Sequence, residues 1–369
     1  MVKIIIVNIF IFLAITGFVL IGLPAVYTMR ELLFSFSKNS AYEIEISRLT
    51  SLSNMRSHSV TKEHLIEFSK LSIIYKDFEI WRRTAINSKT INLDTNGFRI
   101  NGNTKQGDER VAFFGGSTMW GYGVNDDNTI PSHFSKLSKQ STFNYGEVGY
   151  IARQEFNRLA NLYSLGFKPK VVVFYDGVNE VLHKCRTEHN FSSSAQESII
   201  ANRLNSSYKM LNEENDLFTF KYLAQPTLEL LSKIKKRVGG PRNLAMSYDC
   251  DTNPKKLKSI ARAWYFDWLS SKMLVEANQG KFVAILQPVS YISNPELAHL
   301  SSDPMIADKQ LSTQYIAVYN EVKQLLSDQN FKYIDLSASL DNGEAYFFDF
   351  CHLNPDGNRE IAKLILKNI

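Results

Sequence analysis

Residues 111–118 read VAFFGGST, four apolar residues followed by two glycines, a serine and a threonine. A short apolar run that ends in glycine fits a buried parallel strand. In open α/β sheets, ligands bind at the carboxyl ends of such strands. The pattern therefore predicts a strand that places Ser117 at the edge of a sheet as a candidate nucleophile. Taken alone, Gly-Gly-Ser after a strand is also typical of a plain loop or a phosphate-binding turn.

A second fragment, DFCH at residues 349–352, supplies a candidate acid and base. An Asp three residues before a His can accept the Nδ1 proton and leave Nε2 to face a serine. The order Ser117, Asp349, His352 therefore predicts a catalytic triad. The alternative is a helix cap, because NPDGN at residues 354–358 precedes apolar residues at helical spacing.

Two fragments between these ends predict donors for an oxyanion. FNYGEVG at residues 143–149 ends a predicted strand with Gly149, whose backbone N–H can approach a substrate because no Cβ intervenes. The strand KVVVFY at residues 170–175 runs into DGVNE, so Asn179 would project its amide from that strand end. The N–H of Ser117 would complete the oxyanion hole. Gly149 and Asn179 could equally be turn residues.

Together the four fragments resemble the SGNH hydrolases, also called GDSL-like esterases and acylhydrolases, which are named for a Ser, a Gly, an Asn and a His in four sequence blocks. The counterparts in this chain are Ser117, Gly149, Asn179 and His352, the last preceded by Asp349. The resemblance covers residues 95–369. The chain departs from the family pattern at Gly116, where Asp is commoner, and at Glu180, which replaces the usual Asp.

The resemblance implies a flavodoxin-like, doubly wound parallel sheet flanked by helices, and a serine esterase that needs no cofactor. Gly-Gly-Ser variants look like family members associated with bacterial envelope polysaccharides, and NGFR at residues 96–99 is similar to a lead-in seen there. An O-acetylated envelope glycan is the substrate implied. The same residues would serve an O-acetyltransferase.

The rest of residues 95–369 alternates between helical and strand patterns. Such alternation predicts a parallel α/β sheet independently of the resemblance. The predicted helices are 153–165, 259–277 and 314–326, and the predicted strands are 281–286 and 331–336.

The N-terminus predicts where the protein resides. Residues 4–27 contain no charged residue and are long enough to span about 30 Å of hydrocarbon as a helix. We therefore expect residues 1–29 to be an uncleaved transmembrane anchor, with a cleaved signal peptide as the alternative. The short lead before this span favours a periplasmic or extracellular catalytic domain, although the flanking charges leave the orientation open. Residues 30–94 are predicted to be a stalk or lead-in of mostly polar helices.

The alternation of strand and helix patterns is interrupted between residues 185 and 254, which predicts an inserted cap. Cys185 and Cys250 flank this insertion, so they could form a disulfide in an oxidising compartment or remain two free thiols. Cys351, beside His352, is expected to be buried packing, because adjacent side chains diverge. No Cys or His pair has zinc-ligand spacing, so no metal site is predicted.

The formal net charge of +5 is spread along the chain, and no nucleic-acid-binding motif accompanies it. The sequence thus predicts a membrane-anchored serine esterase that acts on an acylated small molecule or glycan, with a lipid ester as the next alternative. A catalytically idle, glycan-binding envelope protein is the alternative from another class. A nucleotide-binding turn at residues 115–118 is disfavoured, because the lysine of a P-loop is missing.

Overall fold

The computed structural model describes residues 43–56, 61–101, 110–188 and 247–369, together with a few isolated positions. The chain divides into two units, residues 1–45 with 201–245, and residues 46–200 with 246–369. The described residues of the first unit are all helical. The second unit contains the sheet and every predicted site residue.

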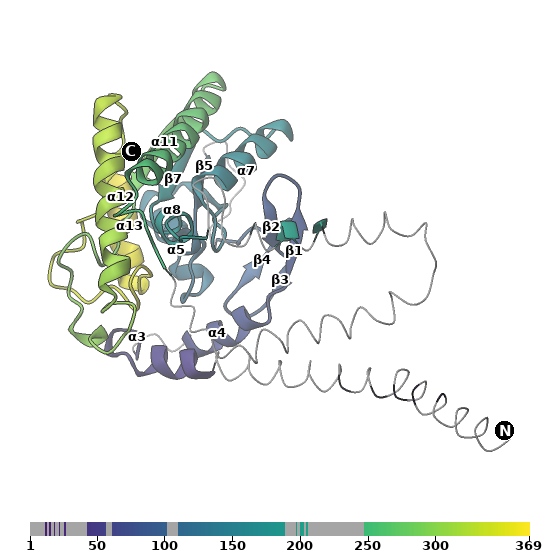
Figure 1. Cartoon of the computed structure of the whole chain (residues 1–369). Helices are drawn as coiled ribbons and strands as arrows, with labels where there is room; N and C mark the ends of the chain where they lie inside the picture. The colour runs from purple at the N-terminus through teal and green to yellow at the C-terminus, as the bar shows by residue number, and fades with distance from the viewer. Residues whose placement is uncertain are drawn as a thin grey trace, which may run out of the picture. The chain divides into compact units, whose positions relative to one another are not determined.

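The second unit is built on a five-stranded parallel sheet (Figure 1). In spatial order its strands are β6 (Ser141–Asn144), β5 (Arg110–Gly115), β7 (Val171–Asp176), β8 (Lys281–Leu286) and β9 (Ile334–Asp335). Counted along the chain from β5, this order is 2-1-3-4-5, the flavodoxin-like doubly wound arrangement. The predicted fold class is therefore confirmed for the sheet.

The strand register aligns the carboxyl ends of the central strands. Gly115 of β5 is opposite Tyr175 of β7, and Tyr175 is opposite Ile285 of β8. The residues that follow these three strands therefore meet at one edge of the sheet. This is the edge where open α/β sheets bind ligands.

Helices cover both faces of the sheet. They are α5 (Ser117–Trp120), α6 (Ile130–Ser138), α7 (Ala152–Ser164), α8 (Val178–Lys184), α11 (Pro254–Ala277), α12 (Lys309–Asp328) and α13 (Pro355–Asn368), with short 3₁₀ turns at Asp126–Asn128 and Ala298–Leu300. Successive residues of a strand point to opposite faces. Along β7, Phe174 accordingly packs in the core under α7, α8, α11 and α12, whereas Tyr175 packs in the core under α6 and α13.

Residues 46–94, predicted to be a lead-in, lie in the same unit as the sheet. They contain α3 (Ser53–Arg56), α4 (Thr61–Ser69) and two antiparallel pairs, β1 (Ile73–Lys76) with β2 (Ile80–Arg83) and β3 (Ile86–Asn87) with β4 (Asn92–Leu93). The expectation that residues 30–94 are mostly helical was wrong for residues 73–83. This stretch instead forms a hairpin with β2 facing the core, where Trp81 is fully buried.

The predicted membrane segment at residues 4–27 lies outside the described residues, apart from isolated helical positions. Within the described part of the chain, no helix is both long enough and apolar enough to cross a membrane. Most of the predicted cap, residues 189–246, also lies outside the described residues.

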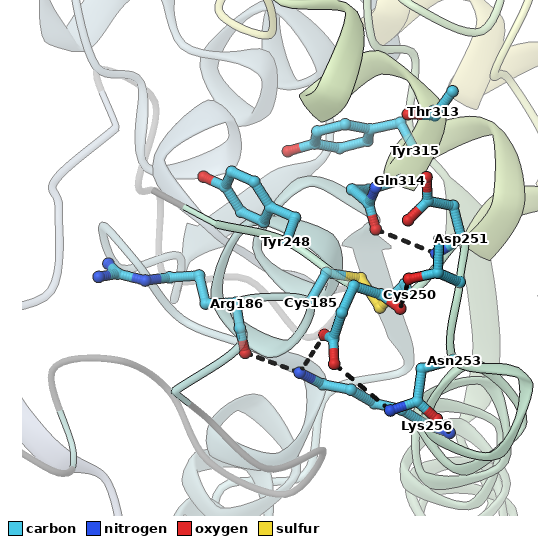
Figure 2. The surroundings of a disulfide bond; sticks show 12 residues. Cys185, Arg186, Tyr248, Cys250, Asp251, Asn253, Lys256, Thr313, Gln314 and Tyr315 are labelled. Atoms are coloured by element: carbon cyan, nitrogen blue, oxygen red, sulfur yellow. Dashed lines mark hydrogen bonds and ion pairs between the residues drawn. A yellow bond between two sulfur atoms is a disulfide. The ribbon is translucent and has the colours of Figure 1, made fainter. Parts of the chain in front are cut away.

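The two ends of this insertion are joined by a disulfide between Cys185 and Cys250 (Figure 2). Of the two alternatives left open by the sequence, the structure therefore has the bonded pair. Lys256 Nζ donates to the carbonyl of Arg186 at 2.7 Å and to Asp249 Oδ1 at 2.6 Å. These contacts fix the base of the insertion beside the start of α11.

Candidate active site

Ser117 is the first residue of α5 and follows β5 after a single glycine. Gly116 allows a close approach, because a Cβ at this position would overlap the side-chain nitrogen of Asn179. The departure from the commoner Gly-Asp-Ser thus has a steric reason in this chain. The first N–H groups of a helix have no partner within the helix. The backbone N–H of Ser117 is therefore free to donate to a ligand.

The structure brings Ser117 together with the two predicted partners near the C-terminus. His352 Nε2 lies 2.7 Å from Ser117 Oγ, and His352 Nδ1 lies 2.6 Å from Asp349 Oδ2. The other carboxylate oxygen, Asp349 Oδ1, accepts from the backbone N–H groups of Cys351 at 2.8 Å and His352 at 2.7 Å. One tight loop thus holds the carboxylate against the ring, as the spacing of the two residues predicted.

The carboxylate of Asp349 is held in its ionised form. Burial raises its pKa, but the adjacent His352 and the two backbone N–H groups outweigh burial and lower the pKa to about 2. A carboxylate at Nδ1 selects the tautomer in which Nε2 can accept a proton. The arrangement can therefore withdraw a proton from Ser117.

Aromatic rings enclose the His352 ring. Tyr122 packs at 4.8 Å and Phe348 stacks at 5.7 Å between ring centroids. Cys351 is buried, and burial raises the pKa of its thiol well above the ordinary value. A neutral buried thiol is a poor nucleophile, in agreement with the expectation that Cys351 is a packing residue.

The backbone of residues 145–152 leaves one N–H without a protein partner. Every N–H from Tyr145 to Ala152 donates to an acceptor except that of Gly149. The acceptors, in chain order, are Phe113 O, Asn144 Oδ1, Gly115 O, Glu147 Oε1, Glu147 O, Gln154 Oε1 and Glu180 Oε1. Gly149 has a φ of +83°, a conformation that favours glycine. Within this fully described loop, Gly149 is thus the residue whose N–H can donate to a ligand.

Asn179 lies in the first turn of α8. Its Nδ2 donates to the carbonyl of Tyr150 at 2.7 Å, and an amide has a second proton to donate. Tyr150 follows Gly149, so the loop and the amide are held together. The preceding Gly177 is sterically required, because a Cβ there would overlap the hydroxyl of Tyr319.

The sequence reasoning missed Gln287, which follows β8 at the same edge of the sheet. Gln287 is buried, and its Oε1 accepts from Thr118 Oγ1 at 3.3 Å. Its Nε2 is buried without a partner among the described residues. Gln287 lies beside Gly116, Tyr150 and Asn179, around a gap too small to hold a water molecule. The signal was present, since a polar residue directly follows the apolar strand KFVAIL.

One group of described side chains places ligand atoms closely enough to hold a metal ion. It consists of Asp349, Cys351 and His352, whose ligand atoms lie within 4.8 Å of one another. Two of these side chains are already hydrogen-bonded to each other, and the third carries a proton at neutral pH. A metal would have to displace both the proton and the contact with Ser117.

The fold and this arrangement define an α/β protein with a hydrogen-bonded Ser-His-Asp set at the carboxyl edge of a parallel sheet. Its sequence matches no protein-family model, and no curated protein has detectable similarity to it. The structure is distantly similar to solved structures of the G-D-S-L type. A lipolytic protein of that family from Veillonella parvula DSM 2008 matches with a TM-score of 0.39 and 13% identity, over 70% of this chain and 97% of that chain.

Two further solved structures have similar scores. The acetyl xylan esterase AlAXEase matches with a TM-score of 0.38 and 16% identity, over 70% of this chain and 99% of its own. A carbohydrate acetylesterase family member from Sinorhizobium meliloti matches with a TM-score of 0.35 and 11% identity, over 70% and 98% of the two chains. These similarities concern the fold.

Proposed function

We propose that the protein is a serine esterase that cleaves acyl esters at Ser117. The observation that carries the proposal is the continuous hydrogen-bonded set Ser117, His352 and Asp349, with the free N–H of Gly149 on a neighbouring loop. This combination supplies a nucleophile, a base and oxyanion donors. Acyl transfer requires these three functions.

In the proposed mechanism, His352 Nε2 takes the proton of Ser117 as Oγ attacks the ester carbonyl. The N–H groups of Ser117 and Gly149 and the amide of Asn179 stabilise the negative oxygen of the tetrahedral intermediate. The intermediate collapses to an acyl-serine, and His352 returns the proton to the departing alcohol. Water, deprotonated by His352, then attacks the acyl-serine and releases the acid.

For the substrate, we propose an O-acetyl group on an envelope polysaccharide, on the basis of the Gly-Gly-Ser and Asn-Gly-Phe-Arg sequences. We further propose that residues 1–29 anchor the protein in a membrane, with the catalytic part in the periplasm or outside the cell. A transferase would follow the same steps, with a sugar hydroxyl in place of the water that attacks the acyl-serine.

The first test measures hydrolysis of p-nitrophenyl acetate by the full chain and by Ser117→Ala, His352→Ala and Asp349→Asn. We expect each variant to lose activity by a factor on the order of 10³ to 10⁴ with little change in melting temperature. Ser301→Ala, an exposed serine outside the site, is the matched control and should retain full activity.

A second readout does not depend on the choice of ester. A fluorophosphonate should modify the full chain at one residue, and mass spectrometry should locate the adduct on Ser117. Labelling of Ser117→Ala equal to that of the wild type, or equal hydrolysis by both, would refute the serine mechanism. An acetylated sugar that appears when a glycan acceptor competes with water would identify a transferase.

A further inference from the structure

The β1–β2 hairpin holds the loop that carries Gly149. The guanidinium of Arg83, at the end of β2, pairs with the carboxylate of Glu147. The backbone N–H of Arg83 also donates to Glu147 Oε2 at 3.2 Å. Both side chains are almost fully buried, with 6% and 1% of their surfaces exposed. A buried carboxylate without its partner is strongly destabilising, so Glu147 depends on Arg83.

Glu147 in turn shapes the turn at Gly149. Its Oε1 accepts from the N–H of Val148 at 2.8 Å, and its backbone carbonyl accepts from the N–H of Tyr150 at 3.2 Å. One residue therefore engages the N–H groups on both sides of Gly149 and leaves the N–H between them free. The direction of the Gly149 N–H is a consequence of where Glu147 is held.

A second set of contacts joins the same hairpin to the same loop. Trp81 Nε1 donates to the carbonyl of Val148 at 3.3 Å, and the hydroxyl of Tyr150 donates to the carbonyl of Trp81 at 2.5 Å. The loop is therefore held through its backbone at Val148 and through the side chain of Tyr150. The hairpin therefore contacts the residues on both sides of Gly149.

Arg83 also reaches the element that begins with Ser117. Its guanidinium lies over the ring of Trp120, the last residue of α5, at 5.2 Å from the ring centroid. A cation over an aromatic face is attracted by the ring quadrupole. Arg83 thus contacts both elements that would supply backbone donors to an oxyanion.

We propose that Arg83 is a positioning residue that acts through Glu147 to aim the N–H of Gly149 at the developing oxyanion. This inference rests on the proposed esterase function. Arg83 does not touch the reacting atoms in this account. Its contribution belongs to the transition state, because the oxyanion forms only there.

The test compares the full chain with Arg83→Met, Glu147→Gln and the double variant on p-nitrophenyl acetate. Glu147→Gln keeps the shape of the side chain, and the double variant removes both buried charges, so folded protein is available even if Arg83→Met is unstable. We expect kcat to fall about 10- to 100-fold in each, with KM within about twofold of wild type. The double variant should lose no more than either single variant, because the two residues act as one unit.

Arg83→Lys keeps the charge and should recover part of the lost kcat. Leu326→Ala, in the α11–α12 side of the core, is the matched control for a purely structural loss. It should lower the melting temperature and leave kcat unchanged. Unchanged kcat in the Arg83 and Glu147 variants, or an equal loss in Leu326→Ala, would overturn the inference. A wild type that hydrolyses no faster than Ser117→Ala would instead overturn the proposed function.

Discussion

Gly116 shows how one missing side chain shapes the candidate site. Its φ of −78° is open to any residue, so the backbone does not require glycine here. The requirement is steric, because the side-chain amide of Asn179 occupies the place of a Cβ. The absence of a Cβ at Gly116 therefore lets the side chain of Asn179 lie against the backbone that precedes Ser117.

Substitution of Gly116 tests this packing. Gly116→Ala should push the Asn179 amide out of position and lower kcat for ester hydrolysis about 10- to 100-fold. This loss approaches the loss of kcat expected when one oxyanion-hole donor is removed. Asn179→Ala should have a similar effect, and the double variant should lose little more than the larger single loss. Additive losses measured in this double-mutant cycle would show that the two positions act separately.

Two buried carboxyl groups behind the site raise each other's cost of ionisation. Burial raises the pKa of Glu155 well above its ordinary value, and the neighbouring Asp176 raises it further. Burial also raises the pKa of Asp176, to about 7, although Glu155 and the hydrogen bond from Trp268 oppose this. Neither carboxylate oxygen of Glu155 has a hydrogen-bond partner among the described residues. A contact between two buried carboxyls is stable only when one is protonated, and we assign the proton to Glu155.

The proton held by Glu155 makes the free energy of unfolding depend on pH. Because burial and the neighbouring Asp176 hold the folded pKa of Glu155 above its unfolded value, the folded state keeps a proton that the unfolded state loses, and stability falls as pH rises above about 4. Glu155→Gln supplies a permanent N–H donor, so its melting temperature should fall less over this range. At pH 8 the variant should therefore retain more of its stability than the wild type does.

The measurement is thermal melting of both proteins at pH 5, 6, 7 and 8. Asp267, whose pKa burial raises to about 6, contributes the same slope to wild type and variant and therefore does not affect the comparison. Parallel curves for the two proteins would contradict a proton held by Glu155 in the folded state.

At the scale of the elements, a disulfide bond joins the two ends of the insertion. The disulfide joins residues 65 positions apart, at the end of α8 and ahead of α11. A cross-link that closes a long loop lowers the entropy of the unfolded chain more than one that closes a short loop. The two ends of the insertion also pair through an antiparallel bridge between Arg186 and Tyr248, so the disulfide reinforces backbone hydrogen bonds that are already there.

Removal of this disulfide bond should cost stability. The loop-closure relation gives about 4 kcal/mol for a loop of this length, as an upper value. Cys185→Ala with Cys250→Ala should therefore lower the urea midpoint, and reductant should shift wild type toward the variant. Cys351→Ala, which removes the free thiol, should retain the full response to reductant. Insensitivity of the wild type to reductant would contradict the pairing.

At the scale of the whole molecule, residues 46–94 are part of the folded unit. Glu79 of this segment pairs with Arg158 of α7 at 2.9 Å, and both side chains are 1% exposed. Burial raises the pKa of Glu79, but Arg158 and Arg82 outweigh burial and leave the pKa below the ordinary value. The segment therefore supplies countercharges that α7 and the Gly149 loop need.

A truncation tests this dependence. A chain that begins at residue 95 lacks Glu79 and Arg83, the ion-pair partners of Arg158 and Glu147, and loss of one member of a buried ion pair costs about 3–5 kcal/mol, which is comparable to the whole stability of many domains. We expect it to show no cooperative melt in near-ultraviolet circular dichroism, whereas a chain that begins at residue 46 should melt cooperatively. A folded, active 95–369 chain would show that the lead-in is dispensable.

The sequence predicted the central strands of the sheet because each is a short, continuous run of mostly apolar residues. It also predicted five candidate site residues, Ser117, Gly149, Asn179, Asp349 and His352, because each follows a strand or precedes a helix, and their catalytic roles stay predictions. At those places local pattern and chain order determine the position in an α/β sheet. Arg83 and Gln287 escaped prediction, since neither lies in one of the four fragments that suggested the chemistry.

The local sequence of this protein thus determined which segments are strands, in what order they follow and which residues stand at their carboxyl ends. Only the tertiary structure decided that Arg83 pairs with Glu147, that Cys185 bonds Cys250, and that Glu155 is buried near Asp176. Hydrophobic periodicity carries no information about such pairs. Each pair depends on where two distant segments meet, and the free energy of a buried charge or thiol is set by that partner.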